Sequence, residues 1–284
     1  MIRALAAMAV VLLSSSRPYA QAEAERPGAA PAPPSFDLSA YTLERGPIAL
    51  SVPDNCSGLA FCPLSRTIFV AVNKPPLLLE IGLDGKTRRK IELAGFDDTE
   101  DVAWVKGNTL AVIEERRRNL CRFDLGGGAR AVAYAKAEKW LVDPVDADNV
   151  GLEGLAWDPA DGCFFVVKEK TPRAIYRVSV PGAKTREAEI ATPWDIEQRS
   201  LSCDDLSGVC YHPATGHLLI LSDESKCVVE ATVDGREIGR LSLRSGSAGL
   251  PADIRQPEGI TVDDRGKLYI CSEPNQLYVF ARGK

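Results

Sequence analysis

The sequence has 284 residues, of which 45% are hydrophobic and 26% charged, and its formal net charge is −5. These values are typical of a globular protein with one large domain or two domains of ordinary size. Since the sequence has no basic stripe with interleaved aromatic residues, its composition excludes a nucleic-acid-binding protein.

The first residues have the pattern of a secretory signal peptide, which we place at residues 1–22. Arg3 precedes an apolar run at residues 4–13, and cleavage is expected after Ala22 or at a neighbouring alanine. The apolar run is too short to span a bilayer, and no later stretch approaches that length. The sequence therefore predicts an exported protein, periplasmic or secreted, without a transmembrane segment.

Residues 23–40 are rich in proline and alanine, which indicates a semi-extended linker before a folded domain at residues 41–284. Within that domain, similar five-residue stretches recur every 43–54 residues, a period typical of propeller blades. They are "SGLAF" at Ser57, "EDVAW" at Glu100, "EGLAW" at Glu153, "SGVCY" at Ser207 and "EGITV" at Glu258.

Each repeat continues with β-rich runs separated by glycine, aspartate, asparagine and proline, which are hairpin signals. In the third repeat, "EGLAW" is followed by the turn "DPADG" and the strands "CFFVVKE" and "AIYRVSV". We predict an all-β fold, a five-bladed β-propeller, rather than a β-sandwich, which would not require regular repeats. The last repeat lacks a fourth strand, and "YTLERGPIALSV" at residues 41–52 is expected to close that blade from the N-terminus.

A carboxylate heads three of the five repeats, at the start of an otherwise apolar strand. In a propeller these first strands line the central channel, and pairing across the following turn places a second polar residue opposite each head. Asp98 and Asp205 extend the resulting ring at one mouth of the channel. The predicted pairs are Glu100 with Glu115, Glu153 with Glu169, Glu258 with Glu273, Ser207 with Asp223, and Ser57 with Asn73.

Like charges that face one another destabilise a strand pair, so this ring requires compensation. The sequence leaves three arrangements open. A hard divalent cation, with Ca²⁺ expected and another divalent ion as the alternative, would take oxygen ligands from Glu100, Glu153, Glu258, Glu115, Glu169, Asp223 and Glu273. Basic side chains would instead fold inward, namely Arg116, Lys168, Arg173 and Arg255. In the third arrangement, some glutamates are protonated or hydrogen-bonded to backbone N–H groups.

The same mouth offers polar side chains for a bound ligand: Asp98, Asp205, Ser57, Ser207, Asn73, Arg173 and Arg255. Trp140 and Trp194 lie on long connections predicted near the mouth, where each would serve either as a ligand anchor or as loop packing. Trp104 and Trp157 follow the strand heads and are expected in the core.

Eight cysteines remain, and an exported chain permits disulfides, with Cys56–Cys62 and Cys203–Cys210 as the nearest pairs in sequence. Most of the cysteines occupy apolar strand positions, where cysteine acts as a small hydrophobic residue. The absence of any CxxC spacing argues against a zinc ribbon or a thioredoxin-like site.

Five stretches resemble the SdiA-regulated family of bacterial exported propellers: "NCSGLAF", "GLEGLAWD", "KEKTPRAIYRV", "DLSGVCYHPATGHLLILSDES" and "QPEGITVDDRGKLYICSEPNQLYVF". They span residues 54–280, nearly the whole expected domain, and the last stretch is the most specific. The resemblance implies a five-bladed propeller with a binding mouth, and no particular reaction. Two features depart from the pattern: Asp101 stands where the other repeats have glycine, and cysteine is unusually abundant.

Three functions are compatible with these features. The first is a binding module whose mouth loops hold a small molecule, a glycan or an envelope protein. The second is a metal-assisted hydrolase of the phosphoesterase or lactonase type, or a glycosidase that uses paired carboxylates. The third is a structural scaffold of the envelope. A Ser-His-Asp site is disfavoured because His212 and His217 lie in the turn of the fourth repeat, far from Ser207.

Overall fold

The computed structural model describes residues 35–143, 151–180, 188–194, 196 and 201–283. The expected signal peptide lies outside this range, as does most of the linker. In the described part of the chain, no helix is long and apolar enough to cross a membrane.

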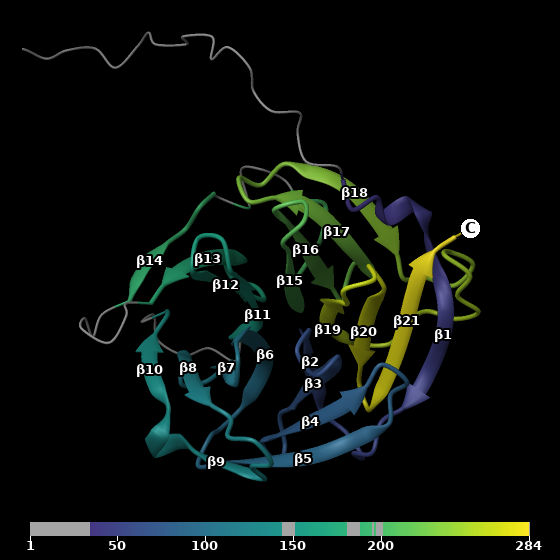
Figure 1. The fold of residues 1–284 in the computed structure, drawn as a ribbon. Coiled ribbons are helices and arrows are strands. Elements are labelled where there is room, and N and C mark those ends of the chain that lie inside the picture. The colour runs from purple at the N-terminus through teal and green to yellow at the C-terminus, as the bar shows by residue number, and fades with distance from the viewer. Residues whose placement is uncertain (1–34, 144–150, 181–187, 195, 197–200, 284) are drawn as a thin grey trace, which may run out of the picture. The chain divides into compact units, whose positions relative to one another are not determined.

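Five β-sheets surround a common centre, with the first strand of each sheet innermost (Figure 1). Successive first strands contact one another around the ring, and the first strand of the last sheet contacts that of the first. The prediction of a five-bladed β-propeller is therefore confirmed.

The blades are built from antiparallel hairpins, and blade one has one additional outer strand, β9, in parallel. Blade one contains β2 (Cys56–Cys62), β3 (Thr67–Val72), β4 (Leu77–Gly82), β5 (Thr87–Ala94) and β9 (Ala131–Ala133). Blade two contains β6 (Thr99–Lys106), β7 (Thr109–Glu114), β8 (Asn119–Asp124) and β10 (Glu138–Leu141). Blade three contains β11 (Leu152–Asp158), β12 (Cys163–Lys168), β13 (Ala174–Ser179) and β14 (Glu189–Ala191). Blade four contains β15 (Gly208–His212), β16 (His217–Ser222), β17 (Cys227–Thr232) and β18 (Glu237–Ser242). Blade five contains β19 (Pro257–Val262), β20 (Leu268–Ser272), β21 (Gln276–Arg282) and β1 (Tyr41–Ala49).

The hydrophobic core lies between neighbouring blades. The second strand of blade three is buried along its whole length because both of its faces are covered. Phe164 packs with residues of blade two, whereas the next residue, Phe165, packs with residues of blade four. This alternation explains why strands such as "CFFVVK" read as continuous apolar runs rather than as alternating ones.

At mid-height, the channel is closed by close backbone contact between the first strands. A Cβ atom on Gly259 would lie 2.8 Å from the backbone of Gly58, and one on Gly58 would lie 2.1 Å from Oδ1 of Asp101. The Asp101 carboxylate accepts the N–H groups of Val102 and Leu155, each at 2.7 Å. Asp101 thus fills the axis that glycines leave free in the other blades, which accounts for its departure from the repeat pattern.

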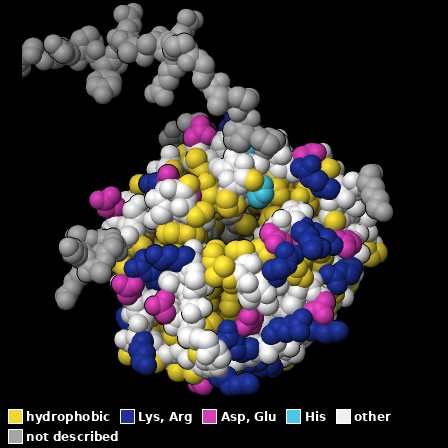
Figure 2. Space-filling view, viewed as in Figure 1, with side chains coloured by type: hydrophobic (Ala, Val, Ile, Leu, Met, Phe, Trp, Pro, Cys, Tyr) yellow, Lys and Arg dark blue, Asp and Glu magenta, His cyan; other side chains and the backbone are white. Residues whose placement is uncertain are grey.

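The two faces of the ring differ around the central axis. Turns after the first strands lie at one end, and the strand heads with their carboxylates lie at the other. Figure 2 shows hydrophobic side chains gathered around the centre of the ring on the face that it views.

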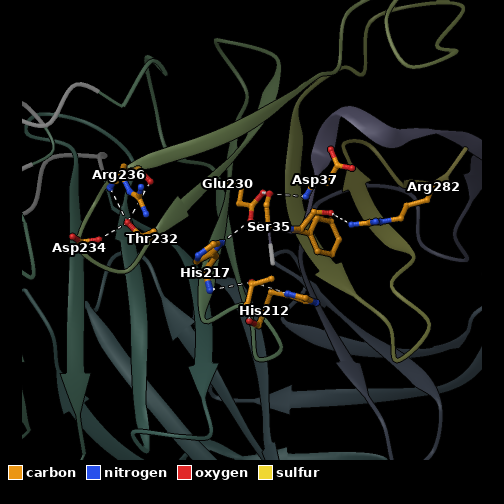
Figure 3. A network of polar contacts seen from close by, with 11 residues as sticks. Ser35, Asp37, His212, His217, Glu230, Thr232, Asp234, Arg236 and Arg282 are labelled. Atoms are coloured by element: carbon orange, nitrogen blue, oxygen red, sulfur yellow. Dashed lines mark hydrogen bonds and ion pairs between the residues drawn. The ribbon is translucent and has the colours of Figure 1, made fainter. Parts of the chain in front are cut away.

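The N-terminal strand closes blade five, as predicted, because β1 pairs antiparallel with β21. The folded part begins before the expected boundary at Tyr41, since Phe36 and Leu38 are buried and a short 3-10 helix, η1 (Leu38–Ala40), precedes β1. Glu230 of blade four holds this segment by accepting the Phe36 N–H at 2.7 Å (Figure 3). His217 lies 2.6 Å from the same carboxylate. Hydrogen bonds to Glu230 therefore hold the closing segment in addition to the pairing of β1 with β21.

The cysteines form no disulfide: all eight are unpaired thiols, and seven of them are buried. The two pairs nearest in sequence, Cys56–Cys62 and Cys203–Cys210, are not bridged. Cys56 and Cys62 stand at opposite ends of β2, so their separation along the strand is too great for a disulfide. The cysteines serve as small hydrophobic residues in the blades.

Candidate functional site

The strand-head residues of four of the five blades lie in β-bulges at one mouth of the channel. In blade three, Leu152 pairs with Lys168 and Gly154 with Val167, so Glu153 is left outside the ladder. The same shift occurs at the heads of blades one, two and five. The prediction that head residues lie directly opposite their partners is therefore wrong in register. A bulge instead redirects the head side chain, and it does so at equivalent places around the ring.

The redirected carboxylates nevertheless converge. Burial raises the pKa of Glu153 well above its usual range, and repulsion by Glu100, Glu115 and Glu258 adds to the effect. Burial also raises the pKa of Glu100 to about 8 and that of Glu258 to about 9. We use the name acidic mouth for the group that shares this field: Asp98, Glu100, Glu115, Glu153, Glu169, Asp205, Asp223, Glu258 and Glu273.

Three members of the acidic mouth form a compact cluster on blade two. Asp98, Glu100 and Glu115 each offer an oxygen atom, and these atoms lie within 4.8 Å of one another. Asp98 precedes β6 and Glu115 follows β7, and the Glu115 N–H donates to the Asp98 carbonyl at 2.9 Å. Burial raises the pKa of Glu115 to about 7, and the nearby Asp98 carboxylate contributes. The hairpin thus brings three carboxylates together, and the raised pKa values of Glu100 and Glu115 show that these two resist ionisation there.

Two buried oxygen atoms near this cluster, Oδ1 of Asn73 and Oγ1 of Thr99, have no hydrogen-bond partner among the described residues. The Asp98 carboxylate oxygens are also buried and make no well-aligned hydrogen bond. Asp98 does form ion pairs, with Arg116 Nε at 2.7 Å and Lys74 Nζ at 3.5 Å. Buried oxygens without donors cost free energy unless a water or a cation satisfies them. The atoms left unpaired are acceptors, as the ligands of a hard cation are.

The other predicted cation ligands lie apart from this cluster or have other partners. The pKa of Glu258 is raised by burial and then by the neighbouring charges of Asp223 and Glu273, on blades four and five. Asp223 forms an ion pair with Lys226, and Glu169 lies 3.0 Å from Lys170 Nζ. The sequence-based set of seven carboxylates is thus spread over several blades, with its tightest part on blade two.

The predicted ligand-binding residues have varied roles. Asp205 accepts hydrogen bonds from Ser222 and from the turn after β16, so it caps that turn. Ser207 donates to the Pro257 carbonyl at 2.7 Å and links blade four to blade five. Ser57 is buried and donates weakly to the Asn55 carbonyl at 3.4 Å. These contacts are structural, whereas Asn73 donates its side-chain amide directly to Glu100.

The four basic residues expected to fold inward behave differently from one another. Arg116 pairs with Asp98 of the cluster. Lys168 is buried against Asp143, at 3.4 Å, and Arg173 donates to the Cys203 carbonyl. Arg255 is exposed to solvent. The basic side chains that compensate the negative charge of the cluster are therefore Arg116 and Lys74. Lys74 was not predicted from the sequence because it stands outside the repeat pattern.

The two tryptophans expected near the mouth are packing residues. Trp140 is buried between blades two and three. Trp194 is buried against Gly235, in the turn between β17 and β18 at the opposite end of the ring. Both are 5–7% exposed, so neither anchors a ligand at the acidic mouth. His212 and His217 lie at that opposite end, as expected.

Solved structures of other propellers are similar to this chain in fold. A chain of a nidogen–laminin complex has 14% identity and a TM-score of 0.51, covering 78% of this chain and 73% of that one. A protein of unknown function from Bacteroides thetaiotaomicron has 16% identity and a TM-score of 0.52, with coverages of 81% and 56%. Regucalcin from Agrobacterium tumefaciens, a calcium-binding protein, has 14% identity and a TM-score of 0.52, with coverages of 86% and 95%. These likenesses support the fold alone.

The family model for SdiA-regulated proteins matches residues 37–281, nearly the whole described range. The chain therefore belongs to the SdiA-regulated family, and the resemblance inferred from the sequence motifs is confirmed.

Proposed function

We propose that this SdiA-regulated propeller binds a divalent cation, with Ca²⁺ as the expected ion, at the cluster of Asp98, Glu100 and Glu115. The observation that carries the proposal is the convergence of three carboxylates within 4.8 Å of one another, beside the buried Oδ1 of Asn73, which has no hydrogen-bond donor. The calcium-binding regucalcin of similar fold agrees with this choice of ion. We also propose export, on the basis of the N-terminal sequence.

The donor set suits a hard cation. Ca²⁺ takes six to eight oxygen ligands from carboxylates, carbonyl groups and waters. Asp98, Glu100 and Glu115 would supply carboxylate oxygens, and Oδ1 of Asn73 is an amide oxygen still without a donor. The described residues of the cluster include no thiol and no imidazole, which softer transition metals prefer.

Cation binding would also resolve the electrostatic strain of the acidic mouth. Glu100 and Glu115, with pKa values of about 8 and about 7, retain protons near neutral pH because burial and neighbouring charges oppose ionisation. A divalent cation displaces these protons and supplies the missing opposite charge. The protonated state and the cation-bound state are thus two ways of satisfying the same oxygens.

The ligand that fits the acidic mouth is a small anionic molecule that reaches the cation from solvent. Lys74 and Arg116 stand at the cluster with more than half of their side chains exposed. Together with a bound cation they would attract a carboxylate or phosphate group. This arrangement favours a binding function at the mouth over a purely structural one.

The test is calorimetric titration of the purified protein with CaCl₂ and with MgCl₂, together with melting temperatures in EDTA and in excess cation. We expect one saturable Ca²⁺ site and a melting temperature that rises with Ca²⁺ concentration, since the ion binds only the folded state. Glu100→Gln and Glu115→Gln should each weaken Ca²⁺ binding about tenfold or more, because the charge of the ligand set decides affinity.

Glu138→Gln is the matched control, since Glu138 is an exposed glutamate paired with Arg122 on blade two. It should bind Ca²⁺ as the native protein does. Glu100→Gln is expected to fold, because glutamine resembles the protonated glutamate present near neutral pH. The proposal is wrong if neither cation produces heat or a melting shift, or if the cluster variants bind as the control does.

Metal-assisted hydrolysis is the second candidate. Glu115 is half-buried at the mouth and has a pKa of about 7, which suits a general base near neutral pH. A bound cation would supply Lewis acidity toward a phosphoester or lactone oxygen. Turnover of p-nitrophenyl phosphate or of a γ-lactone that requires Ca²⁺ and is lost in Glu115→Gln would favour this reading. Ca²⁺ binding without turnover would leave the binding function alone.

A further inference from the structure

The face opposite the acidic mouth carries a cavity that the cation site does not use. The fifth residue of the repeat stretch is aromatic in blades one to four and valine in blade five. All five residues are half-buried and line one cavity of about 410 Å³. We call it the aromatic funnel, after its lining by Phe61, Trp104, Trp157, Tyr211 and Val262. Trp104 and Trp157 pack against the core, as expected, and both also line this cavity.

The aromatic funnel ends at the level where the first strands touch. Its lining includes none of the seven carboxylates expected to hold a cation. The floor is closed by the approach of Gly58, Gly259 and Asp101 to one another. The funnel is therefore a blind pocket, and Figure 2 shows hydrophobic side chains around the centre of the ring.

Charged groups in the lining already have protein partners. Asp263 accepts the N–H groups of Arg265 and Lys267, at 2.9 and 2.8 Å. Asp264 forms an ion pair with Arg66. Because these carboxylates are hydrogen-bonded or ion-paired within the protein, they are not free to bind a ligand directly.

Two N–H groups of the aromatic residues are engaged in the same way. Nε1 of Trp104 donates to the Gly107 carbonyl at 3.0 Å, and the Phe61 N–H donates to Thr261 Oγ1 at 3.0 Å. Ring faces and edges are left for contact with a ligand, and aromatic groups bind one another in stacked or edge-to-face geometry. The volume lies at the lower end of the range of small-molecule sites, about 300–1,000 Å³.

We propose that the aromatic funnel binds an uncharged, flat ring compound of about two or three rings. The ligand is expected to be uncharged because the pocket is blind and apolar and its carboxylates have protein partners. The volume of the pocket limits the ligand to about two or three rings. The site is independent of the acidic mouth, so either proposal can fail without the other.

The probe is N-phenyl-1-naphthylamine, an uncharged three-ring fluorophore that brightens in apolar surroundings. Titration of the purified protein should give a saturable rise with one probe per chain, unchanged by EDTA. Trp104→Leu and Trp157→Leu, on different blades, should each weaken binding about twofold to tenfold, since an aromatic contact of this kind is worth roughly 0.5–1.5 kcal/mol beyond its area.

Two variants serve as controls. Tyr176→Leu removes a half-buried aromatic ring on β13 outside the funnel, and Glu258→Gln neutralises a carboxylate of the acidic mouth. Both should bind the probe as the native protein does, and melting curves establish which variants are folded. A folded tryptophan variant with native affinity, a non-saturable signal, or several probes per chain would overturn the proposal.

Discussion

Lowering the pH from about 8 to about 6 should weaken Ca²⁺ binding at the cluster by about a hundredfold or more. Burial and neighbouring carboxylates raise the pKa of Glu100 to about 8 and that of Glu115 to about 7. At about pH 6, Glu100 is ionised in roughly one molecule in a hundred and Glu115 in about one in ten. At about pH 8, roughly half of the Glu100 side chains and most of the Glu115 side chains are ionised. Because the cation requires both carboxylates, the two factors multiply.

Calorimetry across this pH range, in buffers of different ionisation enthalpy, measures both the affinity and the protons released. We expect between one and two protons to be released per Ca²⁺ bound near pH 7. Glu100→Gln should make the pH dependence shallower, because only Glu115 then titrates in this range. An affinity that stays constant, or that falls as the pH rises, would refute the assignment of these carboxylates as ligands.

Without a cation, the stability of the protein should depend on pH in the opposite direction to its Ca²⁺ affinity. A carboxyl group whose pKa is raised in the folded state stabilises the fold below its unfolded pKa, and that stability is lost as the pH rises through the folded pKa. Unfolding free energy measured in EDTA should therefore decrease from about pH 5 to about pH 9. Excess Ca²⁺ should remove the part of this decrease that Glu100 and Glu115 contribute, because the cation compensates these two carboxylates once they are ionised.

Three substitutions test the scaffold, each by urea denaturation. Asp101→Ala leaves two buried N–H groups unpaired and should cost about 2–5 kcal/mol, with Asp101→Asn closer to the native protein; equal stability of the alanine variant would contradict the role of this carboxylate at the axis. Glu230→Ala releases the segment before β1 and should cost about 1–3 kcal/mol, with faster amide exchange there; unchanged exchange would show that strand pairing alone closes the ring. Asp143→Asn removes the negative charge between the buried side chains of Arg118 and Lys168 and should lower the free energy of unfolding by about 3 kcal/mol. A gain in stability would mean that burying these charges costs more than their pairing contributes.

Much of the architecture could be predicted from the sequence because its signals are local. Five repeats with hairpin turns define five blades, and an unpaired last hairpin requires a strand from the N-terminus, which β1 supplies. Glu100 and Glu115 could be placed at the same mouth because each heads or ends a strand of one hairpin. Asp98 was associated with the mouth, although its place within the tightest cluster became evident only in the structure.

The remaining features depend on distances between strands that are far apart in sequence. A one-residue bulge at the strand heads of four blades changes which side chains face each other, and the repeat pattern is compatible with either register. Trp104 and Trp157 are expected in the core from the sequence, and they do pack against it, but their place in the lining of the aromatic funnel follows from the arrangement of all five first strands. The sequence by itself determined the number of blades and the acidic end of each first strand, since these follow from period and composition. Only the tertiary structure decided how closely the strands approach at the axis, and that approach separates the acidic mouth from the aromatic funnel.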